Sequence, residues 1–255
     1  MFKPDLLTGR VALVTGASSG LGRHFAQLLA RHGADVVVAA RRADALASVA
    51  NEIGALGRRA FVVPIDVRDP ASVEAAMRSA VAQASRVDIL VNNAGVALTK
   101  PALATSDEEW RSVVDTNLDG AFRVARATAQ AMADAKGGGS IVNIASILGL
   151  RVTKQVAPYI AAKAALLRLS EALALEWAMH GIRVNAIAPG YVETELNRDF
   201  LRSPAGESMM KRVAMRRFGK PDDLDGALLL LASDAGRYMT GATITVDGGH
   251  SLAWL

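Results

Sequence analysis

The chain has 255 residues, of which 51% are hydrophobic and 21% are charged, and its formal net charge is +4. This composition is typical of a water-soluble globular protein with a sizeable core. The absence of cysteine excludes disulfides and thiolate metal sites. The four histidines (His24, His32, His180 and His250) lie far apart in the sequence and show no metal-ligand spacing, so we expect surface or structural roles and no metal site.

The sequence favours a cytoplasmic protein that uses neither a membrane nor nucleic acid. The N-terminal residues MFKPDLLTGR lack the apolar region of a signal peptide, and the longest aliphatic run spans only 227–232. A membrane helix needs ~20 apolar residues. The arginine pairs at 41–42, 58–59 and 216–217 are scattered and form no basic stripe. A mildly basic surface suits attraction of an anionic cofactor instead.

Short apolar runs alternate with segments of helical composition along the first 95 residues. The predicted strands are 10–15, 34–40, 60–65 and 88–91, and the predicted helices between them are 20–32, 43–56 and 70–84. Strands that alternate with helices of this length indicate βαβ units and a parallel sheet.

The same alternation continues to the end of the chain. We expect helices at 107–135, 155–179 and 221–233, and strands at 140–145, 183–188 and 242–246. Residues 191–219 lack a strand pattern and predict a mobile substrate cap with one or two short helices. No linker interrupts the pattern, so the predicted fold is a single α/β domain, 1–255. Its expected architecture is a doubly wound, mainly parallel, seven-stranded Rossmann-type sheet with helices on both faces.

A glycine-rich turn joins the first strand to the first helix. Gly16, Gly20 and Gly22 let the backbone approach a pyrophosphate, which the amides at the start of the helix then bind. A turn without a ligand is the alternative. The second strand ends in Arg41 and Arg42 where an NAD enzyme usually presents an acid. A guanidinium suits a 2′-phosphate, so we expect NADP(H), with Arg41 as the main contact, rather than NAD(H). The alternative is that the two arginines cap the following helix, and for Arg42 the two interpretations stand equal.

Further polar residues follow the next strands. Asp66 is expected to accept the adenine amino group, unless it caps the following helix. Residues 92–95 (NNAG) end the fourth strand and suit close packing against a ribose, unless they form a ligand-free turn. Asn117 lies inside a predicted helix with Gly120 nearby, and both residues disfavour helix. This predicts a kink or a bound water, or simply a bond from Asn117 to the backbone.

Ser146, Tyr159 and Lys163 bring together a hydroxyl, a phenol and an ammonium. Ser146 follows a strand, at the edge where open α/β sheets bind ligands, and the four-residue spacing puts Tyr159 and Lys163 on one helix face. A nearby lysine cation is expected to lower the pKa of the phenol, which suits proton transfer to or from an oxygen. The alternative is a packed tyrosine beside a surface lysine.

Taken together, these motifs resemble the short-chain dehydrogenase/reductase family over nearly the whole chain. The resemblance rests on the pattern Thr15-Gly16-x-x-x-Gly20-x-Gly22, on Asn92-Asn93-Ala94-Gly95, Asn117, Ser146, Tyr159-x-x-x-Lys163, Pro189-Gly190 and Asp247-Gly248-Gly249. The chain is similar to single-domain members such as 3-oxoacyl-carrier-protein reductases and sugar, steroid and small-ketone reductases.

The resemblance implies a role for each matched catalytic position. Tyr159 would be the general acid in reduction and the base in oxidation, and Ser146 would orient the substrate oxygen. Lys163 would lower the pKa of Tyr159 and hold the nicotinamide ribose. Asn117 would hold a water in a proton relay behind Lys163. The family also implies a homotetramer built partly through helices 107–135 and 155–179.

A larger set of residues is expected to line the cofactor. These residues are Gly16, Ser18, Ser19, Gly20, Leu21, Gly22, Arg41, Arg42, Asp66, Val67, Asn93, Ala94, Gly95, Tyr159, Lys163, Pro189, Gly190, Val192 and Thr194. Ser19 departs from the basic residue that many NADP-dependent members carry there, so the NADP(H) prediction rests on Arg41 and the missing acid.

The expected function is NADP(H)-dependent interconversion of a ketone and a secondary alcohol. Met209, Met210 and Met215 in the cap favour a partly apolar substrate such as a 3-oxoacyl compound, and the cap arginines allow a carrier protein. The alternatives are an NAD-dependent sugar, polyol or sugar-acid dehydrogenase and a non-catalytic dinucleotide-binding sensor.

Overall fold

The computed structural model of the chain describes residues 3–195 and 197–252. Its centre is a seven-stranded sheet in the order β3-β2-β1-β4-β5-β6-β7, in which all neighbouring strands are parallel. The strands are β1 (Val11–Thr15), β2 (Asp35–Ala40), β3 (Ala60–Pro64), β4 (Ile89–Asn92), β5 (Gly139–Ile144), β6 (Ile182–Pro189) and β7 (Thr243–Val246). The strand order reverses between β1 and β4. This confirms the predicted doubly wound, Rossmann-type fold.

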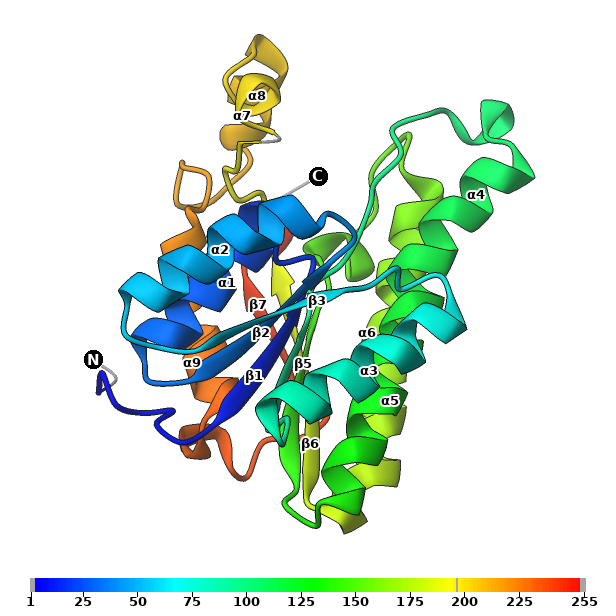
Figure 1. The fold of residues 1–255 in the computed structure, drawn as a ribbon. Coiled ribbons are helices and arrows are strands. Elements are labelled where there is room, and N and C mark those ends of the chain that lie inside the picture. The colour runs from blue at the N-terminus through cyan, green and yellow to red at the C-terminus, as the bar shows by residue number, and fades with distance from the viewer. Residues whose placement is uncertain (1–2, 196, 253–255) are drawn as a thin grey trace.

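Helices cover both faces of the sheet (Figure 1). One face carries α1 (Gly20–Arg31), α2 (Ala43–Ala55) and α9 (Asp225–Ala232). The other face carries α3 (Pro70–Ala84), α5 (Gly120–Asp134) and α6 (Ala157–Trp177). The short helix α4 (Asp107–Val114) precedes α5. Among the helices in the described ranges, none is long and apolar enough to cross a membrane.

The central strands are buried on both faces, which explains their unbroken apolar sequences. In β2, Val36 and Val38 join the core under α1, α2 and α9, whereas Val37 and Ala39 join the core under α3, α5 and α6. All of β1 is buried as well. The sheet therefore forms a rigid platform whose loops at the carboxyl edge carry the polar residues.

The segment predicted as one helix over 107–135 is interrupted in its middle. A π-helical turn, Asp115–Asp119, separates α4 from α5. At its end, Gly120 packs so closely that a Cβ atom there would lie 2.7 Å from Cγ2 of Val67. The expected irregularity at Asn117 is confirmed, and a π-turn is a common way to make one.

Residues 191–219 leave the sheet and project beyond its carboxyl edge (Figure 1). They contain two short helices, α7 (Arg198–Leu201) and α8 (Pro204–Met210), as the sequence predicted. The base of this segment is closed where Glu193 N donates to Gly219 O at 2.8 Å and Gly219 N donates to Tyr191 O at 2.9 Å. The helix predicted over 221–233 starts with a 3-10 turn, Pro221–Leu224, before α9.

The start of β2 depends on a buried carboxylate, and this generates a prediction about acid stability. Asp35 accepts from the backbone N and side-chain Nε of Arg59 at 3.1 and 2.7 Å and pairs with Arg58 at 2.7 Å. Burial raises the pKa of Asp35, but the Arg59 hydrogen bonds and the two arginine charges outweigh it and hold this pKa below 3.8. The stabilisation is therefore present above the unfolded value and is lost as the pH falls through the lowered native pKa.

We expect Asp35→Asn to lower the free energy of unfolding at pH 7 by about 1–3 kcal/mol. The gap between the variant and the original protein should narrow as the pH falls below 3.8 and through the lowered native pKa of Asp35. Urea unfolding over a pH series measures it, with the exposed Asp44→Asn on α2 as a control. A gap that stays constant down to pH 2 would show that the charge of Asp35 contributes nothing.

Candidate active site

A cleft of about 870 Å³ opens at the carboxyl edge of the sheet, around the point where the strand order reverses. Almost every residue that the sequence singled out lines it. These residues are Gly16, Ser18, Ser19, Gly20, Leu21, Arg41, Arg42, Asp66, Val67, Asn93, Ala94, Gly95, Ser146, Tyr159, Lys163, Pro189, Gly190, Val192 and Thr194. Gly22 and Asn117 are the exceptions among the predicted residues, and both lie behind the lining.

A second cavity of about 680 Å³ lies near the amino ends of the strands, at the opposite edge of the sheet. Its lining includes Arg10, Asp88 and Arg183, and it contains none of the predicted residues. Arg183 is occupied there by the carbonyl oxygens of Leu231, Ser233 and Met239. The chemistry-bearing groups therefore concentrate in the first cleft.

The glycine turn forms an open cradle at one end of the cleft. Gly16 and Gly20 have φ values of +67° and +53°, which favour glycine. A Cβ atom on Gly16 would lie 2.9 Å from Nδ2 of Asn93, and one on Gly22 would overlap the carbonyl oxygen of Gly16. Helix α1 begins here, and its N-cap residue Ser19 makes no capping bond through its side chain. The cradle therefore fits a bound anion such as the pyrophosphate of a dinucleotide.

The ends of β1 and β4 are tied together by Thr15. Its hydroxyl accepts from the backbone N of Asn93 and of Ala94, each at 3.0 Å, and Asn93 Nδ2 donates to Thr15 O at 3.0 Å. Asn92 points away from the cleft and donates to Ala121 O at 2.7 Å. The NNAG segment is thus a turn held by hydrogen bonds, and Asn93, Ala94 and Gly95 line the cleft.

At the adenine end expected from the motifs, the carboxylate of Asp66 is bound by a residue that sequence reasoning missed. Arg68 donates to it from Nη2 at 2.7 Å and from the backbone N at 3.0 Å. The side-chain bond from Arg68 is the main reason that the pKa of Asp66 falls to about 2, and Arg41 adds a smaller charge effect. The alternative that Asp66 caps α3 is wrong, because Asp69 is the N-cap and accepts from Ala71 N at 3.0 Å.

The two arginines after β2 are both exposed at the rim of the cleft. Arg42 Nη2 donates to Oγ of Ser18 at 3.3 Å, across the mouth of the glycine turn. Arg42 occupies the N-cap position of α2, but its side chain makes no capping bond. The Arg42 side chain therefore does not cap α2, and both arginines line the rim of the cleft.

Ser146, Tyr159 and Lys163 meet at the other end of the cleft. Ser146 follows β5 and is 8% exposed, while Tyr159 and Lys163 come from the first turns of α6. Lys163 is only 4% exposed, which excludes a surface lysine. Its Nζ donates to Ile144 O at 2.7 Å and lies 5.7 Å from the centroid of the Tyr159 ring. The predicted convergence of these three groups is therefore confirmed.

The electrostatics of the pair differ from the sequence expectation. Burial raises the pKa of Tyr159, a hydrogen bond from the Ser146 side chain opposes this rise, and Tyr191 adds to it. Burial also lowers the pKa of Lys163 to about 8. The expectation of a net lowered pKa for the phenol is wrong in this structure, because desolvation of Tyr159 by the surrounding protein exceeds any lowering effect of the ammonium. Tyr159 is a protonated phenol near neutral pH.

Asn117 is fully buried in the π-helical turn and holds a neighbouring loop. Its Oδ1 accepts from Val96 N, and its Nδ2 donates to Val96 O, both at 2.7 Å. A Cβ on Gly95 would approach that Oδ1 to 3.1 Å. The backbone-bonding alternative is therefore the one that the structure shows, and the loop that Asn117 holds forms one wall of the cleft.

Much of the remaining wall consists of residues that the sequence did not single out. They include Lys154, Gln155, Tyr191 and Phe200. Of the three cap methionines expected at the substrate, Met209 lines the cleft, whereas Met210 and Met215 do not.

Gln155 adopts φ of +68°, and its carbonyl accepts from Lys100 N at 2.7 Å. Such a strained position beside Tyr159 was not visible in the sequence, because glutamine carries no signal for it.

Comparison with known proteins places this geometry in a family. The family model described as Enoyl-(Acyl carrier protein) reductase matches residues 16–251. The chain is 42% identical to galactitol 2-dehydrogenase (L-tagatose-forming) of Cereibacter sphaeroides, with 96% of each chain covered. It is 39% identical to 3-oxoacyl-[acyl-carrier-protein] reductase of Escherichia coli, with 94% of this chain and 97% of that protein covered.

A solved structure shares the fold at similar identity. The crystal structure of a gluconate 5-dehydrogenase from Burkholderia cenocepacia, in complex with NADP and tartrate, superimposes with a TM-score of 0.94 at 38% identity. The match covers 98% of both chains. Together with the fold and the convergent site, these similarities show that the chain belongs to the short-chain dehydrogenase/reductase family of oxidoreductases.

Proposed function

We propose that this protein is an NADP(H)-dependent oxidoreductase that interconverts a ketone and a secondary alcohol, with Tyr159 as the general acid and base. The observation that carries this proposal is the presence of Ser146, Tyr159 and Lys163 in the same cleft as the glycine cradle. A dinucleotide-binding sensor has no need for a buried cation beside a phenol, since burying an ammonium costs stability.

The site residues divide the chemistry between them. When bound, the nicotinamide cofactor supplies or accepts the hydride. Ser146 holds the substrate oxygen, and the neutral phenol of Tyr159 donates its proton to that oxygen in reduction. Lys163 Nζ, 5.7 Å from the ring centroid, stabilises the phenolate that remains after donation. Both amide atoms of Asn117 are engaged by Val96, so we propose that Asn117 positions the cleft wall and that any relay water binds to neighbouring backbone.

The charge at the adenine end supports NADP(H) over NAD(H). Asp66 is neutralised by Arg68, which leaves Arg41 and Arg42 as uncompensated cations on the cleft rim among the described residues. A 2′-phosphate adds negative charge that two guanidinium groups bind well. The related gluconate 5-dehydrogenase was crystallised with NADP, which agrees with this choice.

The substrate end supports two classes of carbonyl compound. Phe200, Met209 and Tyr191 provide apolar surface that suits a 3-oxoacyl chain or a similar carbonyl compound. Thr153, Lys154 and Gln155, which precede Tyr159 in the sequence, add polar groups to the lining of the cleft. These groups and the similarity to galactitol 2-dehydrogenase favour a polyol or sugar acid as the second candidate.

Further expectations remain proposals, among them a cytoplasmic location. The continuous sheet supports a single domain in which residues 191–219 cap the substrate. Exposed apolar side chains on α4 and α6, such as Trp110 and Leu175, support the expected homotetramer.

Replacing the proposed acid tests the reaction. We expect Tyr159→Phe to lower kcat about 10²–10⁴-fold because the substrate oxygen loses its proton donor. The measurement is NADPH oxidation against a panel of 3-oxoacyl thioesters, ketoses and keto sugar acids. The control is Tyr238→Phe, since Tyr238 is fully exposed and lies at the second cavity. Unchanged turnover in a folded Tyr159→Phe variant would exclude the proposed role.

Removing the charge of Arg41 tests the proposed preference for NADP(H) over NAD(H). Arg41→Ala should weaken NADPH binding about 10–100-fold, the loss expected for one charged hydrogen bond, and should leave NADH binding nearly unchanged. Fluorescence titration of both cofactors measures this, with Arg31→Ala at the exposed end of α1 as the control. A preference of the unmodified protein for NADH would contradict the NADP(H) assignment.

The buried ammonium predicts a pH-dependent stability. Lys163 has a native pKa of about 8 against 10.5 when unfolded, so between these values the unfolded chain binds a proton that the folded chain has released. Stability from this group therefore rises with pH from about 8 and levels off above 10.5. Relative to Lys163→Met, the free energy of unfolding should gain about 3 kcal/mol across that range. Lys154→Met is the exposed control, and a flat difference would show that Lys163 is not desolvated.

A further inference from the structure

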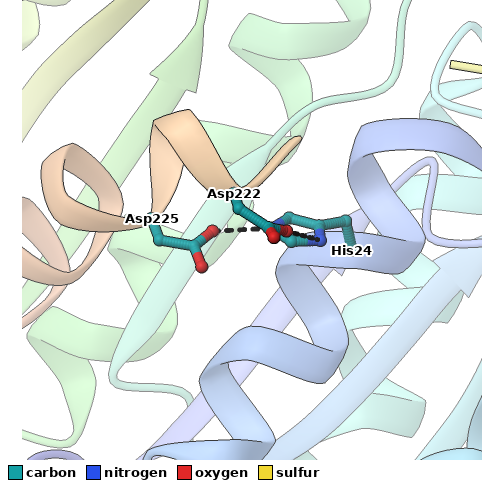
Figure 2. Close-up of side chains that lie close together, drawn as sticks. All are labelled: His24, Asp222 and Asp225. Carbon is teal, nitrogen blue, oxygen red and sulfur yellow. Dashed lines mark hydrogen bonds and ion pairs between the residues drawn. The ribbon is translucent and has the colours of Figure 1, made fainter. Parts of the chain in front are cut away.

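Three metal-ligating side chains meet on the surface away from the cleft (Figure 2). His24 lies on α1, Asp222 lies in the 3-10 turn Pro221–Leu224, and Asp225 is the first residue of α9. His24 Nε2 is 2.6 Å from Oδ1 of Asp225, and Nδ1 is 3.7 Å from Oδ1 of Asp222. One ligand atom from each residue lies within 4.8 Å of the other two, and no other such group occurs within residues 3–195 and 197–252.

We propose that these three residues bind a divalent transition-metal ion of the zinc type, and that the ion fastens α1 to the base of the cap. One imidazole nitrogen and two carboxylate oxygens suit Zn²⁺ and also Co²⁺, Ni²⁺ or Mn²⁺. Water would complete the coordination, because the side chains supply only three ligand atoms.

The geometry needs only small side-chain movements to accept such an ion. Ligands of one tetrahedral zinc ion, with bonds of ~2.0–2.1 Å, lie about 3.3 Å apart. The His24–Asp225 pair therefore opens by less than about 1 Å. Asp222 must rotate toward the nitrogen that Asp225 faces, and its side chain is 82% exposed and free to do so.

The local charge favours a cation. Two carboxylates flank one imidazole, and among the described residues no lysine or arginine forms an ion pair with either Asp222 or Asp225. Two neighbouring arginines are engaged elsewhere, because Arg23 pairs with Glu52 and Arg217 pairs with Asp223, and Lys220 acts on Asp223 through its charge. A divalent ion would balance both carboxylates at once.

The backbone that carries the ligands is held in place by the core. Phe25, next to His24, and Leu224 and Leu228, around Asp225, are fully buried in the same apolar cluster. The two ligands that are least exposed, His24 and Asp225, are therefore fixed at their Cα positions before an ion arrives. This lowers the entropy cost of binding.

The position of the site suggests a structural role. Helix α1 starts at the glycine cradle, and the turn with Asp222 follows Gly219, which closes the base of the cap with Tyr191 and Glu193. None of the three ligands lines the cleft. The bound ion would therefore stabilise the fold around the cradle without touching substrate or cofactor.

Metal titration of the full chain tests this proposal. After dialysis against a chelator, Co²⁺ is added and its visible absorption is followed, then Zn²⁺ is added in competition, and the melting temperature is recorded with and without Zn²⁺. The variants are His24→Gln, Asp225→Asn and the exposed Asp222→Asn. The matched control is His32→Gln, which removes a histidine from the end of the same helix.

We expect one equivalent of Co²⁺ to bind with a tetrahedral or five-coordinate spectrum, and Zn²⁺ to displace it and raise the melting temperature. Each ligand variant should weaken binding at least tenfold, whereas His32→Gln should not. Asp222→Asn keeps the result decisive if the His24 variant fails to fold. No binding at 0.1 mM metal, or Asp222 and Asp225 variants that bind as tightly as the unmodified protein, would overturn the proposal and leave only the contact of His24 with Asp225.

Discussion

One hydroxyl group ties together the carboxyl ends of the two strands on which the cleft depends. After β1 the chain turns into α1 on one face of the sheet, and after β4 it runs toward α4 and α5 on the other face. Open α/β sheets bind ligands in the crevice that forms where two neighbouring strands connect to opposite faces of the sheet. Thr15 sits on its floor, and its Oγ1 accepts two backbone amides from the β4 side that would otherwise be unpaired at a strand end. The same contacts set the distance at which Gly16 faces Asn93.

Several features that are unfavourable for folding lie around this crevice. Lys163 is a buried cation satisfied by one carbonyl, Gln155 occupies a left-handed backbone conformation, and the helix at Asn117 widens into a π-turn. Each feature opposes folding by itself. They persist because the doubly covered sheet supplies enough buried apolar surface to hold them. Such clustering of unfavourable features on one side of a fold is typical of a functional site.

The sequence predicted the fold and the lining of the cleft because both arise from local patterns. Strand and helix alternation, the glycine cradle and the four-residue spacing of Tyr159 and Lys163 each lie within a short segment. The sequence could not predict how deeply Tyr159 is buried, so the expected direction of its pKa shift was wrong. Contacts between distant segments were also missed, such as His24 with Asp225, which lie 201 residues apart.

The two halves of the cleft differ in what builds them, and this difference limits what the family can reveal. The half around the glycine turn, where we propose that the cofactor binds, consists largely of backbone and small residues at the ends of β1 and β4, and a Cβ atom on Gly16 or Gly22 would lie 2.9 Å or less from a neighbouring atom. The other half, where we propose that the substrate binds, includes side chains from the 153–156 loop and the cap. The base of the cap is closed by backbone hydrogen bonds among Tyr191, Glu193 and Gly219 and by the ion pair of Arg217 with Asp223. Close packing therefore constrains the half around the glycine turn, whereas the cap and loop side chains can differ without disturbing the sheet, which is how one fold can host different functions.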